Sequence, residues 1–376
     1  VTPTSGALHP NFRRPRSSRI SIADIPRVYF FLAMMFRSRL VLCTVLTLLA
    51  ACVRGRGSSC HDKDTRRSTA KVVKEMPFLG LFDDLREQSV FEGSDIVRVR
   101  GKYYVVFDSS YSIGYLDDRF QFRDPANQLI GGKGQNDSQF EGIAYVPEDD
   151  TFLLLHESQE HEGGYKPFVT TARLSKDGKE YERLSKCVVD FELTHENKGF
   201  EGMAYVKNSK GAFLLGLCEG NFCEGGRRGR KSGNGRIIIL QLDTDDNGCR
   251  WVKKDVLDIP KEANFIDYSA MAIDYNLGRI AILSQENAAF WVADFDIESL
   301  DFVGTGSIVH LPRNEHCEIV YCNAEGIQWI DAYRVIVVSD RAKATQPYHC
   351  DEHDQSVHIF GLPGAASKAS PAIDWE

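Results

Sequence analysis

A five-fold internal repeat constrains the fold of this 376-residue chain more than any other feature. Each copy begins with a short segment built around Glu-Gly or a variant of it, and continues after a polar turn into a stronger apolar run. The copies open at Phe91, Phe140, Phe200, Tyr268 and Ala324, at spacings of 49, 60, 68 and 56 residues. Short apolar runs separated by Gly, Asn and Asp turns, without long helical periodicity, predict an all-β chain.

Two further strand-like runs follow in each unit, and four antiparallel strands per unit are typical of a β-propeller blade. The fifth copy ends at its third strand, Val357–Leu362. The apolar run Met76–Leu85 is the candidate for the missing fourth strand, which would close the ring and remove exposed sheet edges. We therefore predict a β-propeller of five four-stranded blades closed by an N-terminal strand, with six blades as the alternative.

The segments before the repeats indicate a secreted protein. The basic stretch Met35–Arg39 precedes Leu40–Ala51, twelve uncharged residues that are too short to span a bilayer and are typical of a signal peptide. The predicted segments are an upstream or targeting segment (1–34), a signal peptide (35–52), a polar linker (53–75), the propeller domain (76–362) and a C-terminal tail (363–376). A transit peptide in the Arg-rich upstream segment and a lipid anchor at Cys52, which fits a bacterial lipobox, are the alternatives.

Cysteine usage agrees with an oxidising compartment. Without Cys43 and Cys52, eight cysteines remain, enough for four disulfides that sequence alone cannot assign. The pairs Cys218/Cys223 and Cys317/Cys322 are each five residues apart, and each could close a local loop. This C-x4-C spacing differs from the C-x2-C of common zinc sites, so we favour disulfides.

Charge narrows the class of partner. Residues 53–376 carry 38 basic and 52 acidic residues, a net charge of −14. This balance excludes nucleic acid as the expected partner, because a phosphate backbone is bound by Lys and Arg. We expect a small-molecule or glycan ligand, a monomer, and contact with a membrane only through a lipid anchor.

Carboxylates recur at two positions of the repeat. The first series opens the first strand of each copy and is interrupted by Ser269; its members are Glu92, Glu141, Glu201 and Glu325. The second series closes the next strand and comprises Asp108, Glu157, Glu219, Glu286 and Asp340. Because the start of one antiparallel strand lies beside the end of its partner, nine carboxylates should meet at one mouth of the central channel.

Crowded carboxylates raise one another's pKa or require a counter-charge, and Ca²⁺ binds six to eight oxygen atoms. We therefore predict a Ca²⁺ site. Its candidate ligands are Glu92, Glu141, Glu201, Glu325, Asp108, Glu286 and Asp340. Glu157 and Glu219 are the candidate general bases, and Arg341, His156 and Asn287 are the candidate substrate contacts. In the alternative, the Glu-Gly glutamates bond backbone N–H groups of the next blade and fix the blade spacing.

Three long loops are predicted at the same mouth: Gln159–Lys166, Gly220–Gly235 and Ala342–Gln355. The H-E-x3-H of His156–His161 is one residue longer than the zinc-protease motif and lies on a strand, so we exclude that motif. The segment His349–Asp354 is rich in metal-ligand types, but a disulfide-anchored polar loop explains it better than a second metal site.

The paired motifs EGIAYV…LLLHES and AEGIQWI…VVSDR resemble those of the SdiA-regulated and esterase-like phytase propellers. More distantly they are similar to gluconolactonase- and strictosidine-synthase-like propellers, in which a Glu-Gly near an inner strand supplies a metal-binding Glu. The resemblance covers about residues 76–362 and implies Glu92, Glu141, Glu201 and Glu325 as ligands. The sequence shows no compelling His dyad or nucleophile.

These observations lead to two functions. The first is a secreted or surface, Ca²⁺-dependent hydrolase of ester, lactone or phosphoester bonds, in which a carboxylate acts on water as general base. The alternative is a non-catalytic propeller that binds a carbohydrate, peptide or protein partner at the same face. The fold hosts both classes, so the sequence leaves the enzymatic activity open.

Overall fold

The computed structural model describes residues 68–132, 134, 136–193, 199–218, 233–246 and 248–364. This part of the chain is built mainly from strands, with a short α-helix, α3 (Phe78–Leu81), and a 3₁₀ helix, η2 (Tyr348–His353). The all-β prediction is therefore confirmed. Within the described residues no helix has the length and apolar character needed to cross a membrane. The predicted upstream segment, signal peptide, Cys52 and nearly all of the tail lie outside these residues.

The strands form antiparallel meanders of four, each continuing directly along its sheet. The first meander contains β2 (Gly93–Val99), β3 (Lys102–Phe107), β4 (Ser110–Leu116) and β5 (Gln128–Gly131). The second contains β6 (Phe140–Val146), β7 (Thr151–His161), β8 (Gly164–Leu174) and β9 (Tyr181–Asp190). The third contains β10 (Phe200–Asn208), β11 (Gly211–Cys218), β12 (Arg236–Asp245) and β13 (Gly248–Asp258). The fourth contains β14 (Ala270–Asp274), β15 (Arg279–Ser284), β16 (Ala289–Asp296) and β17 (Asp301–His310).

The last meander combines the two ends of the described chain. It is ordered β18 (Ala324–Asp331), β19 (Arg334–Ser339), β20 (Ser356–Gly361) and β1 (Lys71–Pro77). The prediction that an N-terminal strand joins this sheet is correct, but the predicted residues were wrong. The strand begins at Lys71, inside the segment assigned to the polar linker, and residues after Pro77 turn into α3. The prediction chose Met76–Leu85 because that run is the more apolar one. An outer strand needs only one apolar face, so the more polar Lys71–Pro77 can take this position.

Buried polar contacts hold β1 in place. Glu75 on β1 accepts hydrogen bonds from His358 Nδ1 on β20 (2.9 Å) and from His353 Nδ1 on η2 (2.8 Å). The other ring nitrogen of His358 lies 2.8 Å from Ser339 Oγ on β19. These contacts lower the pKa of the Glu75 carboxyl below its ordinary value, even though burial acts in the opposite direction. One charged network therefore links three strands of the last meander.

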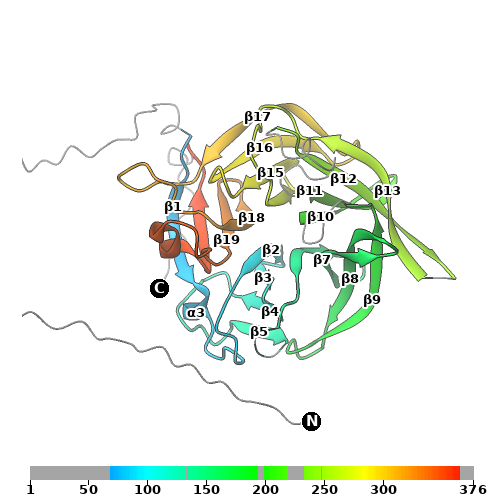
Figure 1. Ribbon diagram of the computed structural model, residues 1–376, viewed down its shortest axis with the longest axis horizontal. Coiled ribbons are helices and arrows are strands. Elements are labelled where there is room, and N and C mark those ends of the chain that lie inside the picture. Colours follow the sequence, from blue (N-terminus) through cyan, green and yellow to red (C-terminus); the bar gives the residue numbers. More distant parts are fainter. Residues whose placement is uncertain are drawn as a thin grey trace, which may run out of the picture. The chain divides into compact units, whose positions relative to one another are not determined.

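The first strands of the meanders form a closed ring of neighbours: β2 contacts β6, β6 contacts β10, β10 contacts β14, β14 contacts β18, and β18 contacts β2. In Figure 1 the meanders radiate from this centre, with β2, β10 and β18 innermost and β9, β13 and β17 outside. This radial arrangement is that of a β-propeller. Apolar side chains fill the space between neighbouring meanders; one such cluster joins Phe107 of the first meander to Val338 of the last.

The sheets of the second and third meanders are continuous because their outer strands pair in parallel, with Trp251 of β13 opposite Val189 of β9. The disulfide Cys187–Cys249 joins the same two strands. A second disulfide joins Cys322 to Cys350, so the predicted local pair Cys317/Cys322 is wrong. Cys218 and Cys317 are also disulfide-bonded, while Cys60 and Cys223 lie outside the described residues. These bonds indicate an oxidising environment.

The glycine of the Glu-Gly motif allows the inner strands to approach closely. A Cβ atom on Gly326 would lie 2.7 Å from the Cα of Asp95 on the neighbouring inner strand. A Cβ atom on Gly202 would lie 3.2 Å from the Cα of Ala270. Both contacts are with backbone that cannot move independently of its strand, so this part of the repeated motif has a structural cause.

Candidate functional site

The backbone brings the two acidic positions of each repeat to the same end of the sheet. The N–H of Asp108 donates to the carbonyl of Glu92 (2.9 Å), and the N–H of Asp340 donates to the carbonyl of Asn323 (2.8 Å). In the second meander the N–H of Glu157 donates to the carbonyl of Gln139 in the same way (2.9 Å). The predicted pairing of strand starts with strand ends is therefore present, and it defines one mouth of the channel.

Strand register corrects the membership of the first acidic series. The pairing of β6, β10 and β18 with their partners skips one residue near the strand start, at Glu141, Glu201 and Glu325. In the first meander the skipped residue is Ser94, because Gly93 pairs with Phe107 and Asp95 with Val106. In the fourth meander Ala270 pairs with Leu283, as the residue after the skipped one does in the other meanders, so Ser269 is the equivalent position. We call these five the bulge positions: Ser94, Glu141, Glu201, Ser269 and Glu325.

Glu92 therefore stands two residues before its bulge position rather than on it. Its counterparts in the other meanders are Gln139, Gly199, Asp267 and Asn323. Aligning the five copies by sequence missed this shift, because in the first copy the Phe-Glu-Gly motif stands two residues before the structurally equivalent position. It also missed Asp267, whose carboxylate accepts the N–H groups of Gln285 (3.1 Å) and Glu286 (3.1 Å). Burial raises the pKa of Asp267.

Five carboxylates at this mouth act on one another electrostatically, and we call them the acidic cluster: Glu92, Asp108, Glu201, Glu325 and Asp340. Burial raises the pKa of Asp340 to about 7, with further contributions from the charges of Glu92 and Asp108. Burial raises the pKa of Asp108 to about 6, and the charges of Asp137 and Glu92 add to this effect.

Glu325 is the most strongly affected member of the acidic cluster. Burial raises its pKa well above the ordinary value, and the charges of Asp340 and Glu201 raise it further, while Lys343 acts in the opposite direction. Gln285 Nε2 donates a 3.1 Å hydrogen bond to Glu325 Oε1 and so fixes the carboxyl group. The cluster thus contains more acid than the nearby lysine can neutralise.

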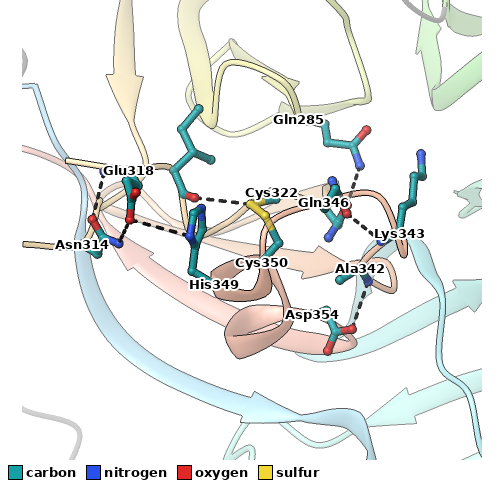
Figure 2. The surroundings of a disulfide bond; sticks show 12 residues. Gln285, Asn314, Glu318, Cys322, Ala342, Lys343, Gln346, His349, Cys350 and Asp354 are labelled. Atoms are coloured by element: carbon teal, nitrogen blue, oxygen red, sulfur yellow. Dashed lines mark hydrogen bonds and ion pairs between the residues drawn. A yellow bond between two sulfur atoms is a disulfide. The ribbon is translucent and has the colours of Figure 1, made fainter. Parts of the chain in front are cut away.

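Figure 2 shows the loop that carries Lys343 and Gln346 beside the second disulfide, with Gln285 near Gln346. Gln346 Nε2 donates to Asn323 Oδ1 (2.9 Å), and the N–H of Lys343 donates to Gln346 Oε1 (2.6 Å). The N–H of Ala342 donates to Asp354 Oδ2 (3.0 Å). Because Cys350 is bonded to Cys322, the residue next to Asn323, the loop is tied to the strand that carries Glu325.

Asp95, which takes the place of the glycine in the first meander, makes an inter-blade contact of the kind expected of the Glu-Gly glutamates. Asp95 is 2% exposed, and its Oδ2 accepts the N–H of Ile143 on the next inner strand at 3.0 Å. Its Oδ1 accepts the N–H of Ile96 at 2.8 Å. Burial raises the pKa of Asp95 well above its ordinary value.

The structure places two predicted substrate contacts in structural roles. His156 is buried, with Nε2 2.8 Å from Thr170 Oγ1 and Nδ1 3.3 Å from the Ser138 carbonyl. Burial lowers its pKa to about 4, and the charge of Lys186 acts in the same direction. Asn287 Oδ1 accepts the N–H of Ile266 at 2.9 Å. The hydrogen bonds of both side chains are therefore made within the protein.

The remaining predicted site residues are more widely distributed. Glu141 is buried, Glu157 is half-buried, and Glu286 and Arg341 are exposed. Glu219 and most of the loop Gly220–Gly235 lie outside the described residues. The predicted loop Gln159–Lys166 is largely strand, because β7 and β8 extend to a tight turn at Glu162 and Gly163.

The oxygen atoms at the acidic mouth are of the types that bind Ca²⁺. Carboxylate and amide oxygens are the hard ligands that this ion prefers. In the described part of the chain, one group of three potential metal ligands has its ligand atoms within 4.8 Å of one another: Cys322, His349 and Cys350. The sulfur atoms of its two cysteines form a disulfide. The acidic cluster is therefore wider than a cage of three carboxylates.

Comparison with known proteins supplies no family for this chain. No family model matches it, and a search of curated proteins finds no match. The PQQ-bound aldose sugar dehydrogenase of Streptomyces coelicolor is 11% identical, with a TM-score of 0.47, covering 78% of this chain and 98% of its own. The RRP9 WD40 repeats are 9% identical, with a TM-score of 0.37, covering 78% and 99%. At this level of similarity no activity follows.

Proposed function

We propose that the protein is a secreted, Ca²⁺-dependent hydrolase of ester, lactone or phosphoester bonds that acts at the acidic mouth of a five-bladed propeller. In this proposal each meander is one blade, and β1 completes the last one. The observation that carries it is the acidic cluster, in which three carboxyl groups have raised pKa values and the charge of Lys343 opposes this for Glu325 and Asp340. Crowded acids of this kind are common where a protein binds a cation or transfers protons.

Each member of the site has a proposed role. Glu325, oriented by Gln285, and Glu201 would hold the ion, with the amide oxygen of Asn323 nearby. Bound Ca²⁺ would polarise the scissile oxygen as a Lewis acid. Asp340 has a pKa of about 7 without metal, and bound Ca²⁺ would favour its ionised form, so it is the better candidate for the general base. Glu157 remains the base suggested by the sequence.

An activity panel tests this proposal. The full secreted chain is assayed with ester, lactone and phosphoester substrates, in Ca²⁺ and in EDTA. We expect hydrolysis in Ca²⁺ that EDTA abolishes, and a loss of at least about 100-fold in Asp340→Asn, as expected for removal of a general base. Glu182→Gln, which changes an exposed acid on β9, is the control and should keep full activity.

The same panel distinguishes the hydrolase from the alternative function, a non-catalytic binding propeller. A folded, Ca²⁺-binding protein that hydrolyses none of these substrates would overturn the hydrolase and favour a binding propeller. Activity that survives EDTA would contradict the metal requirement but keep the site, provided Asp340→Asn removed it.

A further inference from the structure

The channel contains a second candidate site at the end opposite the acidic cluster. A cavity of about 830 Å³ opens there, lined by residues from all five inner strands and by the turns that follow them. This volume lies in the range of pockets that bind small molecules. None of the residues at the acidic mouth contributes to its wall. The cavity is therefore distinct from the proposed hydrolytic site.

The repeat explains why a cavity forms at this level. Three residues after each bulge position the inner strands place mostly small side chains on the cavity wall: Val97, Ala144, Ala204, Ala272 and Gln328. The next position on each strand is bulkier and surrounds the opening: Arg98, Tyr145, Tyr205, Ile273 and Trp329. Small residues at one level widen the channel, and larger ones at the next form a rim.

Most of the charged groups around the cavity are in ion pairs, and the Arg98 guanidinium, which also lines it, donates to the Ile330 carbonyl at 2.6 Å. Lys207 pairs with Glu148 at 2.9 Å, and Asp274 pairs with Arg279 at 2.8 Å. Asp331 pairs with Arg334 at 2.7 Å. These pairs leave little net charge to attract an ion, in contrast to the opposite mouth.

The groups that a ligand can contact include apolar side chains, the amides of Gln328 and Asn276, and the Arg98 guanidinium. Tyr275 and Leu277, in the turn after β14, are 52% and 51% exposed, which is high for apolar side chains at a cavity opening. Gln328 Oε1 accepts the N–H of Trp329 at 2.7 Å, while its Nε2 has no hydrogen-bond partner among the described residues. The cavity thus combines aromatic and aliphatic walls with several side-chain donors, among them Gln328 Nε2.

We propose that this cavity binds an uncharged, ring-containing apolar molecule that carries a hydrogen-bond acceptor. The rings of Tyr205 and Tyr275 pack against the ligand, and Gln328 Nε2 donates to its acceptor. This binding requires neither Ca²⁺ nor the acidic cluster.

Titration with Nile red, a neutral fused-ring dye with a carbonyl acceptor, tests the proposal on the full chain. We expect saturable binding with blue-shifted emission that EDTA does not change. Ala204→Phe fills the cavity and should weaken binding at least about tenfold, a large effect for one substitution. The matched control is Ala344→Phe, which adds the same ring to an exposed loop position at the acidic mouth and should leave the affinity unchanged.

Two milder variants keep the test valid if Ala204→Phe fails to fold. Gln328→Leu should weaken Nile red about 2- to 10-fold, as for one lost hydrogen bond, and leave binding of anthracene, which lacks an acceptor, unchanged. Tyr275→Ala at the exposed rim should weaken both probes. Absence of saturable binding in the wild type, or equal affinity in wild type and folded Ala204→Phe, would overturn the proposal.

Discussion

The two ends of the same inner strands differ in how their charges are balanced. At the acidic mouth, burial and the charge of Glu92 raise the pKa values of Asp108 and Asp340, and the charge of Lys343 acts against this for Asp340. At the opposite mouth, Lys207 and Arg279 each pair with one acid. Side-chain types at the bulge positions differ from those four residues later, so one repeat supplies two chemically independent surfaces. The following predictions test whether the mouths are independent, from the largest expected effect to the smallest.

Both mouths depend on the closed ring, so removing β1 should abolish both. Deletion of residues 1–77 removes the strand that pairs with β20 and leaves His358 without Glu75. We expect loss of cooperative thermal unfolding by circular dichroism, because the exposed edge and the unpaired buried polar groups destabilise the last meander.

Deletion of residues 1–57 is the matched control, since it retains Cys60, the contacts of Ala70 and β1. Its melting temperature should equal that of the secreted protein. An unchanged melting temperature after deletion through Pro77 would contradict closure by β1.

Ca²⁺ should stabilise the protein through the acidic mouth alone. Because the folded state binds the ion and the unfolded chain scarcely does, the free energy of unfolding should rise by about 2.7 kcal/mol at a hundred times the dissociation constant. Glu325→Gln and Glu201→Gln should weaken this response, and Mg²⁺ should replace Ca²⁺ poorly.

The control for the metal response is Asp331→Asn at the opposite mouth, which should melt with the wild-type dependence on Ca²⁺. Thermal melts across a Ca²⁺ titration provide the measurement. A wild-type melting temperature that is equal in Ca²⁺ and EDTA would remove the metal site and leave the cluster as a structural feature.

The raised pKa values in the acidic cluster should also affect how the free energy of unfolding in EDTA depends on pH, with a smaller effect than that of Ca²⁺. The pKa values of Asp340 and Asp108 rise from 3.8 to about 7 and about 6. Between about pH 4 and 7 these two carboxyl groups bind more protons in the folded than in the unfolded state, so their contribution to stability falls as pH rises. The lowered pKa of His156 contributes in the opposite direction, so the cluster is measured by comparing variants.

Asp340→Asn removes one of these protons, so its stability should fall less steeply from pH 4 to 7 in denaturant titrations. Asp331→Asn should keep the wild-type slope in that range. Equal slopes in wild type and Asp340→Asn would show that Asp340 titrates at its ordinary pKa and would contradict the assigned cluster.

The sequence by itself determined the all-β fold, the four-strand repeat and the alternation of acidic positions, because strand pattern and turn residues are local signals. It also placed Asp108 and Asp340 at one end of their hairpins, since strand pairing follows from chain order.

Only the tertiary structure decided which residues act together. Strand register moved Ser94, rather than Glu92, to the bulge position, because one skipped residue is invisible in a repeated motif. The closing strand begins at Lys71 because this segment pairs with the edge of β20. Its polar sequence does not by itself predict a strand. The cavity arose from small residues on five strands far apart in sequence, such as Ala144 and Ala272, whose common surface exists only once the ring closes.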